Sequence, residues 1–434
     1  ESDLSLSGSF NSNSSASPSA LTLRAENGSI VLSGSYGQTS ALGSVSFIGE
    51  ADLSSSIYTS SGAISFSQDV ILEAPTILDT TAQGSSPGAD ITFSGLVNSG
   101  SSGLASLEMN LGSGGSLLLS ESIGLDSRLS SLVVLAAKSA TTKDILVSDT
   151  LSINAPLTLS QDSSTLSSSG SGGVFLSDVE ASIAGTQDLN VEGSSGSVSL
   201  GLIGATTPFR DFTLLSASKA SASSITTSRA IDIDAPLVLV DNTILSTLGA
   251  GSEGGSIGIL SVDGDSLGTR SLTLLAGQGT VSLEGTIGKS APLSNLSVSA
   301  AKIELISELI ATDGAQEYSG PFEVFIPSAI RSRESIIFDS SLQPAVGSPS
   351  LLFYPGGGSL SVAGSLGDAP FDTVAIFNAG EVNLSDVSAT HFVISGGLAN
   401  VTLSGEISLS SGGVFLIDAG PLSLGGKITT SGSW

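Results

Sequence analysis

Hydrophobic and polar side chains alternate along most of this chain in short runs. Examples are Ser271–Leu275 and Thr280–Glu284, in which every second position is apolar. A period of two residues is typical of a β-strand that buries one face. Breaks such as Gly277–Gly279 separate the runs, and their Gly, Ser and Asp residues favour tight corners. No stretch of about 12 or more residues keeps an apolar period of 3.6 residues without Gly or Pro, so we expect almost no helix.

These strand-like runs belong to an internal repeat. Similar blocks end in a glycine about 80 residues apart, at Gly37, Gly124, Gly204, Gly288 and Gly367. Two further features recur in the same register, a proline beside a strand-like run and a lysine after small residues: Pro75, Pro156, Pro236 and Pro321, and Lys138, Lys219 and Lys302. Strand clusters also recur about every 20 residues, which is the length of one rung of a β-solenoid.

The pattern therefore predicts an all-β fold, a parallel β-helix (β-solenoid) of about 21 rungs, each of about 20 residues, with sequence repeats of about 80 residues. The alternative is a string of four or five β-sandwich modules. It is disfavoured because aromatic residues make up only 5% of the chain. In addition, the repeated prolines lie within strand-like runs, where modules would have linkers.

We expect three regions along the chain. Residues 1–20 form a ragged, Ser- and Asn-rich entry, residues 21–320 form the repeat solenoid, and residues 321–434 form diverged repeats that are richer in phenylalanine. The chain begins at Glu1 without a leader, which indicates a processed product or an excised segment. The sequence up to Trp434 still has the pattern of a strand, and no polar cap follows it.

Composition removes several classes of function. The chain has no cysteine and one histidine, His391, which excludes disulfide scaffolds, thiolate metal sites and multi-histidine zinc sites. Its 13 basic and 40 acidic residues give a formal charge of −27, which opposes binding to nucleic acid. No apolar stretch reaches the length of about 18 residues that a transmembrane helix needs.

Motifs that resemble catalytic sites have structural explanations. The glycines of 249–254 match a dinucleotide fingerprint and those of 254–258 match a nucleophile elbow, but a strand-like run follows, and both motifs need a helix there. Asp232 and Asp234 alternate with isoleucines and are expected to face solvent from one strand. We therefore predict no catalytic residue, no cofactor-binding residue and no enzymatic activity.

Calcium is the one ligand that the composition favours. Asp263 and Asp265 flank a glycine in an expected turn, where their carboxylates would supply the oxygen ligands that Ca²⁺ prefers. The glycine-rich nonapeptide of calcium-binding β-rolls does not recur in the sequence. These two aspartates are the weak metal-site candidates of the chain, and the other expected partner of the acidic surface is a diffuse layer of cations.

Two blocks of sequence resemble a known group of proteins. Residues 279–300 (GTVSLEGTIGKSAPLSNLSVSA) and, more loosely, residues 358–377 are similar to one repeated block of filamentous-haemagglutinin-like adhesins and related bacterial β-strand-repeat exoproteins. Residues 312–325 are similar to the block that follows it, with Gly314, Gln316, Tyr318 and Gly320 in matching places. The resemblance extends over about 70–434. It implies a secreted repeat protein and assigns no binding or catalytic residue.

From these observations we expect an extracellular or cell-surface structural protein of the secreted bacterial type. Its predicted role is the rod-like shaft of a surface fibre or adhesin, self-associating end to end into filaments or attached to a cell surface. A receptor- or carbohydrate-binding adhesin module, with an exposed patch in residues 320–434, is the first alternative. A β-helical polysaccharide-processing enzyme is the second, and it would need two carboxylates about 5–10 Å apart in a cleft.

Overall fold

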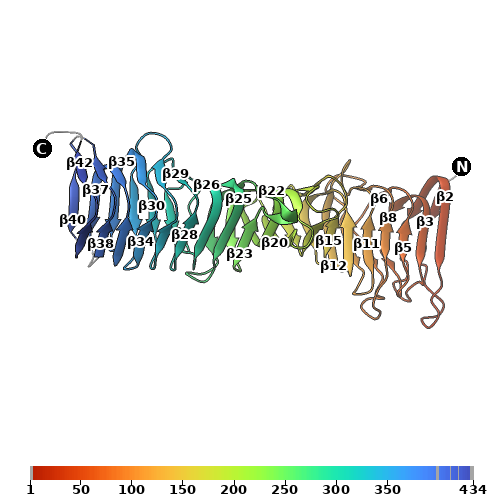
Figure 1. Ribbon diagram of the computed structural model, residues 1–434. Coiled ribbons are helices and arrows are strands. Elements are labelled where there is room, and N and C mark those ends of the chain that lie inside the picture. The colour runs from red at the N-terminus through yellow and green to blue at the C-terminus, as the bar shows by residue number, and fades with distance from the viewer. Residues whose placement is uncertain (1–2, 397–399, 411, 419, 431–434) are drawn as a thin grey trace. The chain divides into compact units, whose positions relative to one another are not determined.

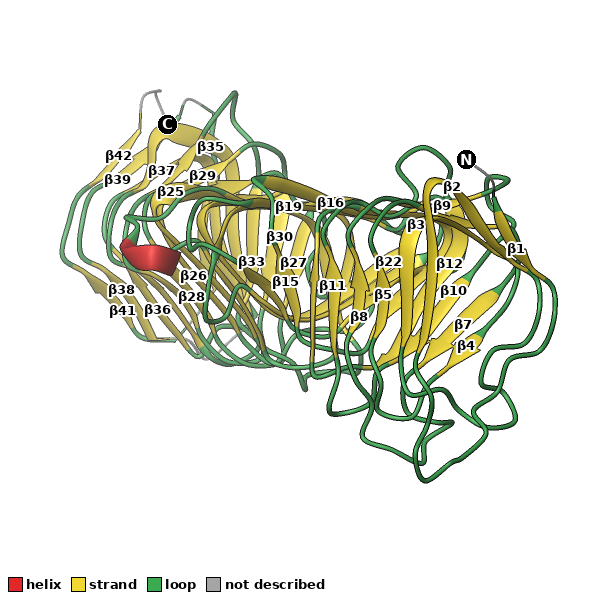
Figure 2. Ribbon diagram, turned by 90° about the vertical axis from the view of Figure 1, so that its right-hand side faces the viewer, coloured by secondary structure: helices red, strands yellow, loops and turns green. Residues whose placement is uncertain are grey.

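A computed structural model describes residues 3–396, 400–410, 412–418 and 420–430. The described residues contain β-strands and one short 3₁₀ turn, Gly249–Gly251, and no α-helix (Figure 2). Contacts divide the chain into two compact units, Glu1–Ala220 and Ser221–Trp434. Glu1 and Trp434, from which a processed start and an uncapped end were inferred, lie outside the described residues.

The strands of the first unit are short. They are β1 (Leu4–Leu6), β2 (Leu21–Leu32), β3 (Val45–Leu53), β4 (Ile57–Tyr58), β5 (Ile64–Phe66), β6 (Val70–Leu72), β7 (Thr76–Asp79), β8 (Ile91–Phe93), β9 (Val97–Ser99), β10 (Leu107–Asn110), β11 (Ser116–Leu119), β12 (Leu129–Ala136), β13 (Ser139–Thr142), β14 (Ile145–Ile153), β15 (Leu157–Leu159), β16 (Ser163–Ser168), β17 (Gly173–Leu176), β18 (Val179–Ala181), β19 (Asp188–Glu192), β20 (Ser197–Ile203) and β21 (Phe209–Ser216).

The second unit has the same pattern, and its first strand, β22, begins in the last two residues of the first unit. Its strands are β22 (Lys219–Leu239), β23 (Thr243–Ser246), β24 (Ile257–Gly264), β25 (Leu272–Leu283), β26 (Leu296–Leu305), β27 (Leu309–Ala311), β28 (Gln316–Ser319), β29 (Phe322–Val324), β30 (Ser328–Arg331), β31 (Ile336–Phe338), β32 (Leu342–Pro344), β33 (Leu351–Tyr354), β34 (Ser359–Val362), β35 (Leu366–Phe377), β36 (Glu381–Leu384), β37 (Val387–Ser395), β38 (Asn400–Leu403), β39 (Ile407–Leu409), β40 (Phe415–Asp418), β41 (Leu422–Leu424) and β42 (Ile428–Thr430).

Most strands pair in parallel with a strand about one turn of chain later, as the stacked arrows of Figure 1 show. In the first unit one ladder of paired residues runs Leu21, Val45, Ile64, Ile91, Leu117, Ala140, Leu157, Val179 and Ile203. In the second unit a ladder runs Leu272, Leu296, Gln316, Ile336, Leu360, Val382, Val401 and Leu422. The predicted β-solenoid is confirmed, with rungs about 22 residues apart.

The repeated glycines form one kind of corner. All five have positive φ: 73° at Gly37, 70° at Gly124, 64° at Gly204, 68° at Gly288 and 91° at Gly367. Residues with a side chain rarely adopt this conformation. The first four also donate their N–H to a carbonyl of an earlier strand or bridge, namely that of Phe10, Val97, Val179 and Val262. The repeated glycines therefore mark corners at which the backbone needs a positive φ.

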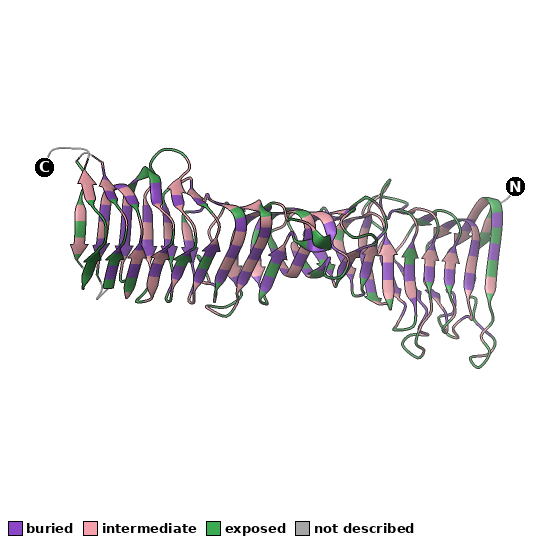
Figure 3. Cartoon of the chain, in the orientation of Figure 1, coloured by how far each residue is buried: buried purple, intermediate pink, exposed green. Residues whose placement is uncertain are grey.

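The core of each unit is a narrow column of stacked side chains. Figure 3 shows the buried positions as bands that recur along the strands. Most are Leu, Val, Ile and Ala, but Phe47, Phe66 and Phe93 stack in successive rungs, with ring centroids 4.5 and 4.7 Å apart. Five of the late phenylalanines are also fully buried: Phe322, Phe338, Phe353, Phe371 and Phe392. Much of the late increase in phenylalanine therefore fills the core.

Candidate functional site

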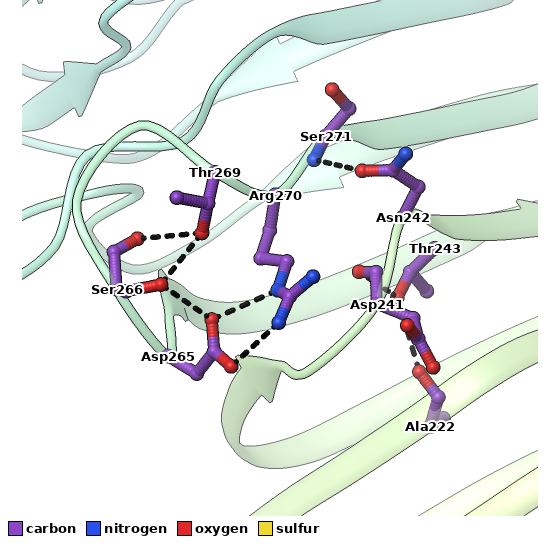
Figure 4. Close-up of polar contacts among 9 residues, drawn as sticks. All are labelled: Ala222, Asp241, Asn242, Thr243, Asp265, Ser266, Thr269, Arg270 and Ser271. Atoms are coloured by element: carbon purple, nitrogen blue, oxygen red, sulfur yellow. Dashed lines mark hydrogen bonds and ion pairs between the residues drawn. The ribbon is translucent and has the colours of Figure 1, made fainter.

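Asp265 lies in the loop that follows β24 and is held by an arginine (Figure 4). Arg270 Nε donates to Asp265 Oδ1 at 2.9 Å, and Arg270 Nη2 donates to Asp265 Oδ2 at 2.9 Å. The hydroxyl of Ser266 adds a bond to Oδ1 at 3.0 Å. The hydrogen bonds from Arg270 hold the pKa of Asp265 at about 2. This carboxylate therefore fastens the two ends of its loop together.

Asp263 has separate partners. Its Oδ1 accepts the backbone N–H of Ser290 at 2.9 Å and that of Ala291 at 3.2 Å. Within the described residues no group of three or more His, Cys, Asp or Glu side chains is placed to hold a metal ion. The two candidate ligands, Asp263 and Asp265, are thus each engaged by protein groups, and calcium binding stays a prediction.

Side chains around this loop connect neighbouring rungs in the same way. Asn242 Oδ1 accepts the N–H of Ser271 at 3.0 Å, and Thr243 Oγ1 donates to the carbonyl of Ala222 at 3.0 Å (Figure 4). In both contacts a polar side chain bonds the backbone of another rung. Corners leave backbone groups outside the strand ladders, and these contacts satisfy them.

Three aspartates repeat one such contact with the same geometry. Asp69, Asp178 and Asp386 each precede a valine, and their Oδ1 atoms accept the N–H of Leu96, Leu202 and Glu406 at 2.8, 3.0 and 2.6 Å. The residue before each donor is a glycine, Gly95, Gly201 or Gly405. A Cβ at these glycines would lie 2.3, 2.8 and 2.2 Å from the aspartate Oδ1. We call this arrangement the Asp–Gly staple.

The Asp–Gly staples are not among the features predicted from the sequence. Their signal is an Asp-Val pair in one rung and a glycine 19 to 26 positions later, at Asp69 and Gly95, Asp178 and Gly201, and Asp386 and Gly405. Such a signal is visible only when rungs of unequal length are already aligned. The staples show that some of the many acidic side chains accept hydrogen bonds from the backbone of the next rung.

Asp232 and Asp234 both face outward from β22, as the alternation predicted. Desolvation raises the pKa of Asp232, and the charge of Asp234 raises it further. The Oδ1 of Asp232 lies beside Gly258 of the next rung, 3.1 Å from where a Cβ would be. Perturbed carboxyls can mark active sites. This pair, however, lines none of the four hollows described in the chain.

His391, on β37, has a structural contact. Its Nδ1 accepts the backbone N–H of Val414 at 3.2 Å. The glycine motif at 249–254 contains the 3₁₀ turn Gly249–Gly251 and leads into strand β24, so the helix that a phosphate-binding or elbow motif needs does not follow it.

No family model, curated protein or solved structure matches the chain. In the part of the chain that the structure describes, no helix has the length and apolar character to cross a membrane.

Proposed function

We propose that this chain is an extracellular structural protein that forms the shaft of a bacterial surface fibre or adhesin. The observation that carries the proposal is the unbroken parallel ladder in each unit, because a stacked solenoid adds length with every rung and needs contact only with its neighbours. Of the residues considered as sites, Asp263 and His391 bond the backbone of another rung, and Asp265 bonds Arg270 within its own loop. The resemblance to filamentous-haemagglutinin-like exoproteins points to the same role.

We further propose that copies stack end to end. In the last described rung, Leu422 and Leu424 are 43% and 48% exposed, whereas their partners one rung earlier, Val401 and Leu403, are 1% and 0% exposed. Among the described strands none covers the outer side of β41. A parallel strand from a second copy, placed beside β41, would bury both leucines and pair with this strand.

Negative-stain images of the purified chain test the shaft. The expected particles are elongated, with the width of one solenoid, and compact globules would contradict the proposal.

Concentration-dependent light scattering tests the stacking. Leu424→Lys should abolish association because it places a charge at the contact. The matched control is Val346→Lys at an exposed loop residue, which should leave association unchanged. Equal association of both variants would exclude this end as the contact.

A further inference from the structure

Loops near the N-terminal end of the chain enclose a hollow of about 420 Å³ in the first unit. Its walls come from four segments, around residues 15–18, 37–41, 58–60 and 82–85. Several long loops extend from the strands in this red-to-orange part of Figure 1. The volume lies within the range of small-molecule sites, about 300–1,000 Å³.

The lining of this hollow is polar but uncharged. No Asp, Glu, Lys or Arg is among its described lining residues, although the chain carries a formal charge of −27. The side chains of Gln38, Thr39, Ser40, Ser60 and Ser85 line it and make no hydrogen bond to any described residue. Amide and hydroxyl groups both donate and accept hydrogen bonds. The hollow thus offers a set of neutral groups that can bond a ligand.

A second hollow of about 230 Å³ adjoins the first, since Tyr58 and Gln38 line both. It too has no charged residue among those described in its lining. Gln38 and Tyr58 are thus common to both hollows, and we call the two hollows together the groove.

The walls of the groove are fixed by specific contacts. Asn11 Oδ1 accepts the N–H of Thr39 at 3.0 Å and that of Ser40 at 3.2 Å, and Gln83 Nε2 donates to the carbonyl of Gln38 at 3.0 Å. Ala82 and Gln83 also have positive φ, 48° and 60°. Residues with a side chain keep this conformation only where the surrounding contacts hold them. The groove is therefore formed before any ligand arrives.

The charge and polarity of the lining decide which ligand fits. A phosphate, a carboxylate or a metal ion would need charged partners, and the lining supplies none. An aliphatic ligand would cover the amides and hydroxyls without bonding them, at a cost in free energy. A neutral sugar offers hydroxyls to Gln38 and its neighbours and a C–H face to the ring of Tyr58.

We infer that this groove binds a neutral saccharide, with Tyr58 as the ring on which the sugar packs and Gln38 as a hydrogen-bonding side chain. Two adjoining hollows that share both residues give room for more than one sugar unit. The inference does not depend on the shaft proposal, since the groove lies within one unit and needs no second copy.

A glycan array that carries neutral and sialylated oligosaccharides tests the inference on the full chain. Saturation-transfer NMR with lactose, cellobiose and chitobiose supplies a second measurement in solution. The expected result is retention of neutral glycans, and Tyr58→Ala and Gln38→Ala should each weaken binding at least about tenfold, which is about 1.4 kcal/mol. The side chain of Gln38 bonds nothing described, so its removal leaves the wall contacts in place.

Matched controls are Tyr354→Ala and Gln343→Ala, which replace the same residue types in the second unit, far along the sequence from the groove. These should bind as the unchanged chain does, with the far-UV circular dichroism spectrum of every variant preserved. Retention of only sialylated glycans, retention of no glycan, or equal binding by Gln38→Ala and Gln343→Ala would each overturn the inference.

Discussion

At the scale of single residues, the repeated glycines show why a solenoid corner accepts so few side chains. Gly288 has φ of 68°, and a Cβ there would lie 2.1 Å from the carbonyl oxygen of Ala311 in the next rung. The residue therefore meets two separate constraints, one on its own backbone and one on the spacing between rungs. Gly347 has the same φ of 68°, but no atom lies within 4 Å of its Cβ position.

This pair of glycines gives the first prediction. Gly347→Ala should lower the free energy of unfolding by about 1–2 kcal/mol, the usual cost of left-handed backbone for a residue with a side chain. Gly288→Ala should lower the free energy of unfolding clearly more, because the next rung, which contains Ala311, must also move. Urea unfolding of the two variants measures the difference. Equal losses would show that the contact with Ala311 is unimportant.

The Asp–Gly staple gives the second prediction. Asp386→Ala removes the acceptor of the Glu406 N–H and should lower the free energy of unfolding by about 1 kcal/mol. Asp386→Asn keeps a carbonyl oxygen in the same place and should lose little. Urea unfolding of both variants is the measurement. A loss in the Asn variant as large as that in the Ala variant would mean that the charge, and not the hydrogen bond, stabilises this corner.

The third prediction concerns pH. The pKa of Asp265 falls from 3.8 to about 2 in the folded chain, so its ion pair with Arg270 stabilises the fold above pH 3.8. That contribution is lost as the pH falls toward 2. The melting temperature of Asp265→Asn should therefore be lower than that of the unchanged chain at neutral pH, and the two should converge near pH 2.

Asp232 supplies the opposite control for the pH experiment. Its pKa is raised in the folded state by desolvation and by Asp234, so ionisation of this carboxyl opposes folding as the pH rises through the raised value. Asp232→Asn should thus be more stable than the unchanged chain at neutral pH and lose that advantage in acid. The same direction of pH dependence for Asp232→Asn and Asp265→Asn would contradict both assignments.

At the scale of elements, short strands are held by what stacks above and below them. Strand β5 has three residues, and its Phe66 lies between Phe47 of β3 and Phe93 of β8 with rings inclined by 16° and 9°. Strands this short gain little from their own backbone bonds, and the column of aromatic rings adds contact along the stack. Contacts between core side chains therefore stabilise the stacking of successive rungs, in addition to the hydrogen bonds of the strand ladders.

Replacing the middle ring tests this column. Phe66→Ala should cost about 3–5 kcal/mol, because it leaves a cavity between two rings in a buried position. The control is Phe175→Ala on β17, whose side chain is 37% exposed and should cost much less. Chemical unfolding followed by far-UV circular dichroism compares them. Similar losses would show that the stacked column is no more important than an outward ring.

At the scale of the whole chain, the formal charge of −27 sets the conditions for association. Like charges on two copies repel each other, and salt shortens the range of this repulsion from about 30 Å at 0.01 M to about 3 Å at 1 M. End-to-end stacking buries apolar surface and would be opposed by this charge at low salt.

Light scattering at several salt concentrations measures the balance. Association should rise between about 0.01 M and about 1 M NaCl, and Leu424→Lys should show no rise. CaCl₂ and MgCl₂ at equal ionic strength should act alike if cations only screen the charge. A larger effect of CaCl₂ that Asp263→Asn removes would instead establish a calcium site.

The sequence alone determined the features that depend on neighbouring residues. The period of two residues predicted strands, the glycine corners predicted the repeat, and the length between strand clusters predicted a solenoid rung close to the observed one. These properties follow from which face of a strand is apolar and which sign φ can take. Both are set within a few residues.

Only the tertiary structure decided which distant residues meet. Asp69 reaches Leu96, but Asp386 reaches Glu406 over a shorter span of sequence, because rungs differ in length and the loops absorb the difference. The larger hollow of the groove likewise combines four segments that lie far apart along the chain. Contacts between rungs depend on the register of the whole stack, and no local pattern in the sequence records that register.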